Sequence, residues 1–211
     1  MKGFRAKPQI DAGHYRKNLN LITFTNCSYQ IRDCLSLAGE EASRVMIIGV
    51  GNGVEAAVLR HLGMEVVTMD IDPHLNPEVI ASAADLPFKD KSFDVVIASH
   101  VLEHLPFACF DGCLREIARI GRHALIYLPF ACLVPELRLS IRPLFSKSLR
   151  LCIPLFWKDY RFDGFHYWEI GVRKYSLARI RREIEKKFTI REAYHNQDWR
   201  YSYNFVLTAI S

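Results

Sequence analysis

The feature that most constrains the fold of this chain is an apolar run that ends in three glycines at alternate positions. Residues 45–53 read VMIIGVGNG. Such a short apolar run is typical of a buried parallel strand. The glycines allow a sharp turn and let a ligand approach the backbone closely. A helix-like segment follows, and its first N–H groups would face that ligand. The stretch therefore predicts a strand–loop–helix nucleotide site.

The glycine spacing indicates which nucleotide the loop would hold. A dinucleotide site favours G-x-G-x-x-G/A, but Val54 stands at the last of these positions and is too large for close helix–strand packing. The pattern present is G-x-G-x-G, from Gly49 to Gly53. It resembles motif I of the class I S-adenosylmethionine (SAM)-dependent methyltransferases.

Two downstream segments strengthen this resemblance. Residues 65–70, EVVTMD, form a short apolar strand that ends in Asp70, where a carboxylate can accept hydrogen bonds from both ribose hydroxyls. Residues 85–106 read DLPFKDKSFDVVIASHVLEHLP, which is very similar to the central block of the type-11 methyltransferase family. The resemblance covers residues 45 to about 129 and implies a SAM-dependent methyltransferase with SAM as its cofactor.

The order of predicted elements gives the same architecture. Strands alternate with helices, which favours a parallel sheet. The resemblance implies a single-domain Rossmann-like α/β fold with a seven-stranded, mostly parallel sheet, an antiparallel last strand and helices on both faces. Expected strands are 44–49, 65–70, 79–82, 93–99, 123–128, 188–194 and 201–210. Expected helices are 14–38 (broken near 25–27), 107–120, 176–187 with Ser176 as N-cap, and one within an otherwise irregular 131–168, near 136–152.

A chain of 211 residues fits one domain. Within it we expect an N-terminal helical lid at 1–43, a SAM-binding core at 44–130, a basic and aromatic acceptor-side insertion at 131–175, and a C-terminal helix and strand pair at 176–211.

In open α/β sheets the ligand lies at the carboxyl ends of the strands. The resemblance places the cofactor there, against Gly49, Val50, Gly51, Gly53, Asp70, Ile71, Ser82, Ala83, Asp85, Ser99 and His100. Two positions depart from the family. Ile47 replaces a usual carboxylate, and Ser82 replaces a frequent acid, for which Asp85 is either a substitute or a turn cap. Asp72, which precedes a proline, is a further candidate cap.

Three residues are candidates for acceptor chemistry. His100 follows the fourth strand directly and is either a base, an acceptor-orienting group or a packing residue. The segment 162–171, FDGFHYWEIG, is either an acceptor wall containing His166 and Glu169 or a hydrophobic cluster. Glu103 and His104 are expected to cap a short helix.

The motifs exclude some acceptors. Methyltransferases of exocyclic base nitrogens resemble one another in an N/D-P-P-Y/F motif after the fourth strand, which here reads SHVL, and Cys109 comes too late for an RNA carbon-5 nucleophile. A small-molecule, glycan or lipid acceptor is favoured over nucleic acid. The alternatives are an RNA methyltransferase that uses a basic block at 131–182, or a catalytically inactive SAM-binding scaffold.

That basic block holds 11 basic and 4 acidic side chains. It is either a solvated face or a surface for an anionic partner. In 128–158 apolar residues alternate with cations, so this part either covers the sheet or touches a membrane surface. The cations are Arg138, Arg142, Lys147, Arg150 and Lys158.

The chain shows no secretory signal or membrane span, and its six cysteines contain no C-x-x-C. We expect buried thiols, no metal and a cytoplasmic protein, with peripheral membrane contact as the alternative.

Overall fold

The computed structural model describes residues 8, 10, 12–17, 19–38, 43–141 and 145–210. Seven strands form its central sheet: β1 (Arg44–Ile48), β2 (Glu65–Asp70), β3 (Val79–Ile80), β4 (Phe93–Ser99), β5 (Gly121–Pro129), β10 (Phe188–His195) and β11 (Ser202–Ala209). Their order is β10-β11-β5-β4-β1-β2-β3. The pairs among β1 to β5 are parallel, and β11 runs antiparallel to both of its neighbours. The predicted Rossmann-like sheet with an antiparallel last strand is confirmed.

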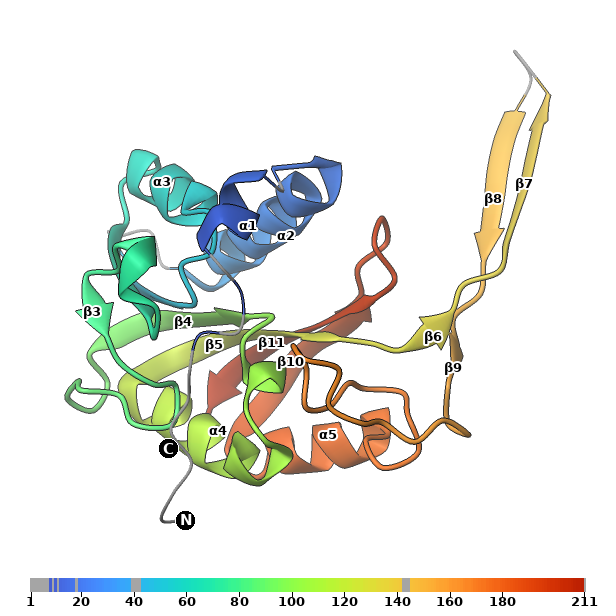
Figure 1. Ribbon diagram of the computed structural model, residues 1–211. Helices are drawn as coiled ribbons and strands as arrows, with labels where there is room; N and C mark the ends of the chain where they lie inside the picture. The colour runs from blue at the N-terminus through green and yellow to red at the C-terminus, as the bar shows by residue number, and fades with distance from the viewer. Residues whose placement is uncertain are drawn as a thin grey trace.

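Helices cover both faces of this sheet (Figure 1). One face carries α1 (Ala12–Lys17), α2 (Leu21–Leu37) and α3 (Val54–His61), and the other carries α4 (Phe110–Ile120) and α5 (Leu177–Glu185). The alternation of side chains along β4 explains the two layers. Val95 and Ile97 pack with Leu59 of α3, whereas Val96 packs on the opposite side with Ile117 of α4.

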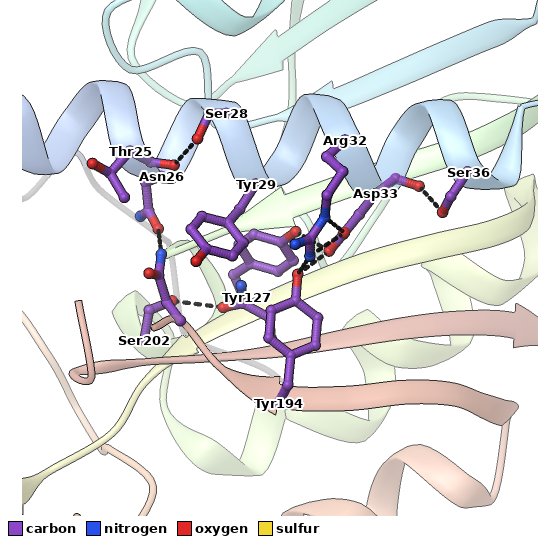
Figure 2. Close-up of polar contacts among 12 residues, drawn as sticks. Thr25, Asn26, Ser28, Tyr29, Arg32, Asp33, Ser36, Tyr127, Tyr194 and Ser202 are labelled. Atoms are coloured by element: carbon purple, nitrogen blue, oxygen red, sulfur yellow. Dashed lines mark hydrogen bonds and ion pairs between the residues drawn. The ribbon is translucent and has the colours of Figure 1, made fainter. Parts of the chain in front are cut away.

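Polar side chains attach α2 to the sheet (Figure 2). The buried Asp33 carboxylate accepts hydrogen bonds from Tyr127 of β5 at 2.5 Å and from Tyr194 of β10. Arg32 pairs with the same carboxylate at 2.7 Å. The helix is therefore held in place over the cleft side of the sheet.

The predicted break near residues 25–27 is wrong. Helix α2 continues through them and begins at Leu21, where the Asn20 side chain accepts from the Thr23 N–H at 3.1 Å. The Ser28 hydroxyl donates to the Thr25 carbonyl at 2.7 Å, within the helix. The Asn26 side chain accepts from Asn196 Nδ2 at 3.3 Å.

Three short 3₁₀ turns connect the main elements: η1 (Pro73–Leu75), η2 (Leu102–His104) and η3 (Phe107–Cys109). Asp72 caps η1 by accepting from the His74 N–H at 3.0 Å, as expected for an acid before proline. The Ser176 hydroxyl accepts from the Arg179 N–H at 3.2 Å, which confirms the predicted N-cap of α5.

The helix predicted near 136–152 is wrong, because this segment forms a β-hairpin. The hairpin consists of β7 (Glu136–Ile141) and β8 (Phe145–Arg150), and the flanking strands β6 (Cys132–Leu133) and β9 (Ile153–Pro154) pair with each other. Leu137 lies opposite Leu149 while Glu136 lies opposite Arg150, so apolar and charged residues alternate with the period of a strand. The β7–β8 pair projects away from the rest of the molecule (Figure 1).

None of the helices in the described part of the chain is long and apolar enough to cross a membrane. All six cysteines are free, and Cys27, Cys34, Cys113 and Cys132 are buried.

Candidate functional site

Two adjoining cavities lie at the carboxyl ends of β1, β2 and β4. The smaller has a volume of about 110 Å³ and the larger about 490 Å³. Tyr15 of α1, Gly49 and His100 line both of them. The predicted N-terminal lid lies partly outside the described residues, but its described helix α1 does contribute to the walls of the cleft.

The glycine loop forms the boundary between the cavities. Gly49, Gly51 and Gly53 have φ angles of +86°, +55° and +74°, a region that side-chain-bearing residues rarely adopt. A Cβ atom at Gly49 would lie only 2.5 Å from Cγ2 of Val101. Gly49 is thus required for its backbone conformation and also for the close approach of η2. Gly51 and Val50 line the larger cavity, and Gly53 serves as the N-cap of α3.

Asp70 connects the glycine loop to the end of β2. Its Oδ2 accepts from the Val50 N–H at 2.9 Å, and its Oδ1 accepts from the Asp72 N–H at 2.9 Å. Each oxygen has a second lone pair, and the carboxylate lines the smaller cavity. The residue is positioned to accept hydrogen bonds from a ligand.

Some of the remaining residues predicted at this end line the smaller cavity, and Asp85 does not. Ile71, Ser82 and Ala83 line the smaller cavity. Asp85 is exposed, and its N–H donates to the Ser82 carbonyl at 2.9 Å in a tight turn. Asp85 therefore stabilises the turn that presents Ser82 and does not itself line the cavity.

Ile47, where the family usually has an acid, packs in the core beneath α2 and α3. Sequence reasoning missed the acid that the structure does offer, Glu55, in the first turn of α3. Glu55 lines the larger cavity, and burial raises its pKa to about 8. In the amide orientation that satisfies both groups, Gln30 donates to Glu55 Oε1 at 2.9 Å and accepts from the Ser99 hydroxyl at 3.1 Å. An acid two residues after the last glycine was the available signal.

His100 stands at the junction of the cavities in an unusual conformation. Its φ is +52°, which is costly for a residue other than glycine. The backbone N–H donates to the Tyr127 carbonyl at 2.9 Å, Nε2 lies 3.2 Å from the Ser202 hydroxyl, and the ring packs against Trp199. These contacts hold the imidazole over the cleft.

The segment 162–171 packs into the hydrophobic core and also lines the larger cavity. Trp168 is completely buried against Phe107 and Phe110, and its Nε1 donates to the Leu105 carbonyl at 3.1 Å. This anchor brings His166 and Glu169 to the wall of the larger cavity. His166 Nδ1 lies 2.8 Å from Glu169 Oε1, so the two side chains act as one hydrogen-bonded unit.

Glu103 is the residue that sequence reasoning misread. It does not cap η2, and its side chain is completely buried. His100 Nδ1 lies 3.5 Å from Glu103 Oε1, and His166 Nε2 lies 4.0 Å from the same atom. Burial alone would raise the Glu103 pKa, but His100, with His104 and His166, holds it below its ordinary value. Burial likewise opposes a charge on His166, yet Glu169 and Glu103 raise its pKa overall.

Residues 46–124 match the family model of a methyltransferase domain. The resemblance to the type-11 family predicted from the sequence is thereby confirmed for this segment. An uncharacterized methyltransferase of Mycobacterium sp. strain KMS is 40% identical over 72 residues. That alignment covers 29% of this chain and 29% of the relative, so the match spans under a third of the relative's length.

Solved structures share the fold over almost the whole chain. A SAM-dependent methyltransferase from Aquifex aeolicus aligns with a TM-score of 0.60 at 12% identity, over 95% of this chain and 100% of its own. The 1,6-didemethyltoxoflavin-N1-methyltransferase of Burkholderia thailandensis, solved with 1,6-didemethyltoxoflavin and S-adenosylhomocysteine, also aligns with a TM-score of 0.60. It is 12% identical, over 94% of this chain and 85% of its own.

Proposed function

We propose that this chain is a SAM-dependent methyltransferase that acts on a small-molecule, glycan or lipid acceptor. The observation that carries the proposal is a continuous cleft at the point where strand order reverses, between β1 and β4. One end presents the glycine loop and Asp70, as a nucleoside requires. The other end presents His100, His166 and Glu169, which are groups that could bind a polar acceptor.

The residues at the first end fit SAM. Gly49 and Gly51 line the cavities without a Cβ, which suits a loop that lies directly against a ligand. Asp70 would hold the ribose hydroxyls, and Ser82 and Ala83 would border the adenine. Glu55 would hold the ammonium of the methionyl part, because a cation beside this carboxylate favours its ionised form. The sulfonium supplies a methyl group for in-line displacement, for which alignment alone contributes roughly 7–11 kcal/mol.

At the second end the protein's role is to position the acceptor and exclude water. His100 is held rigidly by its backbone hydrogen bond and by Trp199, so it can orient a polar acceptor group beside the methyl. The volume of about 490 Å³ lies in the range of small-molecule sites, about 300–1,000 Å³. The acceptor named for the B. thailandensis neighbour is also a small molecule.

Isothermal titration calorimetry with SAM tests the first half of the proposal. We expect binding by the wild type and a loss of at least tenfold in affinity for Asp70→Ala. Asp85→Ala is the matched control, since this nearby acid is exposed and outside the cavities. Equal effects of the two substitutions would remove Asp70 from the site. Absence of SAM binding in the wild type would favour the inactive scaffold.

Methyl-labelled SAM and fractionated cell extract test the second half. We expect label in the small-molecule, glycan or lipid fraction, and reduced labelling by His100→Ala at saturating SAM. Label found only in RNA would contradict the proposed acceptor class.

We also propose that the β7–β8 hairpin contacts an anionic membrane surface. The side chains of Leu137 and Leu149 are paired across it and are 59% and 60% exposed. Phe156 and Trp157, just after β9, are also exposed, and Lys158 next to them is an exposed cation. Exposed apolar side chains on a projecting element, with an exposed cation in the segment that follows it, suit the interfacial region of a bilayer.

The other cations predicted to contact a membrane do not add described free charges to the hairpin. Arg150 is paired with Glu136 at 3.1 Å and donates to the Gln197 carbonyl at 3.1 Å, so it stabilises the hairpin. Arg142, and the side chains of Arg138 and Lys147, lie outside what the structure describes.

Sedimentation with phosphatidylserine-containing liposomes at low and high salt tests this contact. We expect pelleting at low salt that Leu137→Ser with Leu149→Ser abolishes and Lys158→Glu weakens. Lys89→Glu, an exposed cation far along the chain from the hairpin, should have no effect. Pelleting that is unchanged by the paired leucine substitution would exclude the hairpin as the contact.

A further inference from the structure

The buried carboxylate of Glu103 sits among imidazoles beneath the larger cavity and is the least satisfied polar group near the site. We propose that Glu103, His104 and His166 form a binding site for a divalent transition-metal ion of the zinc class. This site goes beyond the proposed methyl transfer, and three independent aspects of the local geometry support it.

The first is the state of Glu103 itself. Its side chain is completely buried, and neither carboxylate oxygen has a hydrogen-bond partner among the residues that the structure describes. The closest nitrogens, His100 Nδ1 at 3.5 Å and His166 Nε2 at 4.0 Å, are too far for good hydrogen bonds. Buried carboxylates are normally paired, hydrogen-bonded or bound to metal. A cation between Glu103 and the histidines would supply the missing partner.

The second aspect is the orientation of the two histidines. His104 Nδ1 lies 2.9 Å from the Phe165 carbonyl, which can only accept, so Nδ1 carries a hydrogen and donates it. His166 Nδ1 lies 2.8 Å from Glu169, which assigns its tautomer in the same way. Metal-binding histidines characteristically donate their other ring N–H to a carbonyl or carboxylate. Both histidines already have this outer support.

The third aspect is spacing. One ligand atom from each of the three residues lies within 4.8 Å of the others. Ligands about 2 Å from a tetrahedral ion lie roughly 3.3 Å apart. Small side-chain shifts toward a common centre would therefore complete the site.

A second group, Asp163 with His166 and Glu169, is equally compact but is already satisfied. Asp163 Oδ1 accepts from the Phe165 and His166 N–H groups at 2.8 and 2.7 Å, and Oδ2 accepts from Tyr160 at 2.9 Å. These bonds build the turn that presents His166. The second group consequently orients His166, and Glu103 is the buried ligand of the proposed metal site.

Two imidazoles and one carboxylate favour Zn²⁺ or a similar ion over Mg²⁺, which prefers oxygen ligands alone. His104 and His166 line the larger cavity, so the open coordination position would face the acceptor. If the proposed function holds, this position selects acceptors that offer a hydroxyl or another oxygen ligand. The sequence predicts no metal here because Glu103 and His166 are 63 residues apart.

The test uses full-length protein stripped with a chelator. Zn²⁺ is titrated by calorimetry, and Co²⁺ by visible absorption, which reports coordination geometry. We expect one ion per chain, with affinity reduced at least 100-fold by Glu103→Gln or His166→Ala and about 10- to 100-fold by Glu169→Gln. His61→Ala, an exposed histidine at the end of α3, should bind as the wild type does.

Circular dichroism and SAM affinity are measured for each variant, so that loss of metal is read only from folded protein. His104→Ala replaces Glu103→Gln if that variant fails to fold. The proposal is overturned if the wild type does not bind Zn²⁺, or if Glu103→Gln and His166→Ala bind Zn²⁺ as tightly as the wild type does. It is also overturned if bound Co²⁺ shows thiolate charge-transfer bands. Failure of the wild type to bind SAM would contradict the proposed function and leave the metal result intact.

Discussion

Gly49 and Gly53 provide a matched pair that separates backbone strain from steric exclusion in the glycine loop. Both have positive φ, +86° and +74°. An alanine Cβ at Gly49 would lie 2.5 Å from Val101 Cγ2, whereas one at Gly53 would meet no heavy atom within 4 Å. Both substitutions therefore lose stability because an alanine must adopt a positive φ, and only Gly49→Ala adds a steric clash.

The magnitudes follow from these two terms. A left-handed conformation costs an alanine roughly 1–2 kcal/mol relative to glycine. Overpacking against a half-buried Val101 adds roughly 1–3 kcal/mol. We expect Gly53→Ala to lower the free energy of unfolding by about 1–2 kcal/mol, and Gly49→Ala by about 2–5 kcal/mol.

Urea unfolding of both variants measures these costs, and calorimetry with SAM measures their effect on the loop. Val101→Ala removes the group that a Cβ at position 49 would meet. The double variant Gly49→Ala/Val101→Ala should therefore lose less unfolding free energy than the two single variants lose together, and the difference measures the cost of overpacking. If Gly53→Ala costs as much as Gly49→Ala, or if the double variant shows no such coupling, the steric reasoning fails.

Three further predictions concern other parts of the molecule. Asp33→Ala should lower the free energy of unfolding by about 3–5 kcal/mol, because it leaves the buried Tyr127 hydroxyl and the Arg32 guanidinium without their acceptor. Urea unfolding of Asp33→Ala, Tyr127→Phe and the double variant should show that the two costs are coupled. Trp168→Ala should cost about 3–5 kcal/mol and weaken acceptor turnover more than SAM binding, which steady-state kinetics and calorimetry separate. Glu55 has a folded pKa raised to about 8, so its contribution to stability is fully present below pH 4.5 and is lost as pH rises through 8. Unfolding measured from pH 5 to 9 should show that Glu55→Gln flattens this decline, and an unchanged slope would contradict the assignment.

Short-range patterns in the sequence determined the architecture. The apolar run before Gly49, the acid at Asp70 and the alternation of strands with helices depend on neighbouring residues alone, and each predicts its element without knowledge of the fold. The same logic placed Ser176 at the start of α5. Where local signals were mixed, it failed. The residues at 136–150 alternate apolar and polar, but Pro143 and the cations obscure the period, and the hairpin was predicted as a helix.

The chemistry of the acceptor side depends on distances between segments remote in sequence. Glu103 reads as an ordinary helix-cap residue until Trp168 anchors residues 162–171 against η2 and brings His166 to within 4.0 Å of it. The structure places Ile47 in the core and Glu55 on the wall of the larger cavity, so only the structure identifies Glu55 as the acid of the cavity. Burial and the convergence of charged groups are properties of packing, which no local pattern encodes. The sequence by itself therefore determined the fold and placed Gly49 and Asp70 at the strand ends that line the cleft, and the tertiary structure alone decided which other acids and imidazoles face the cavities.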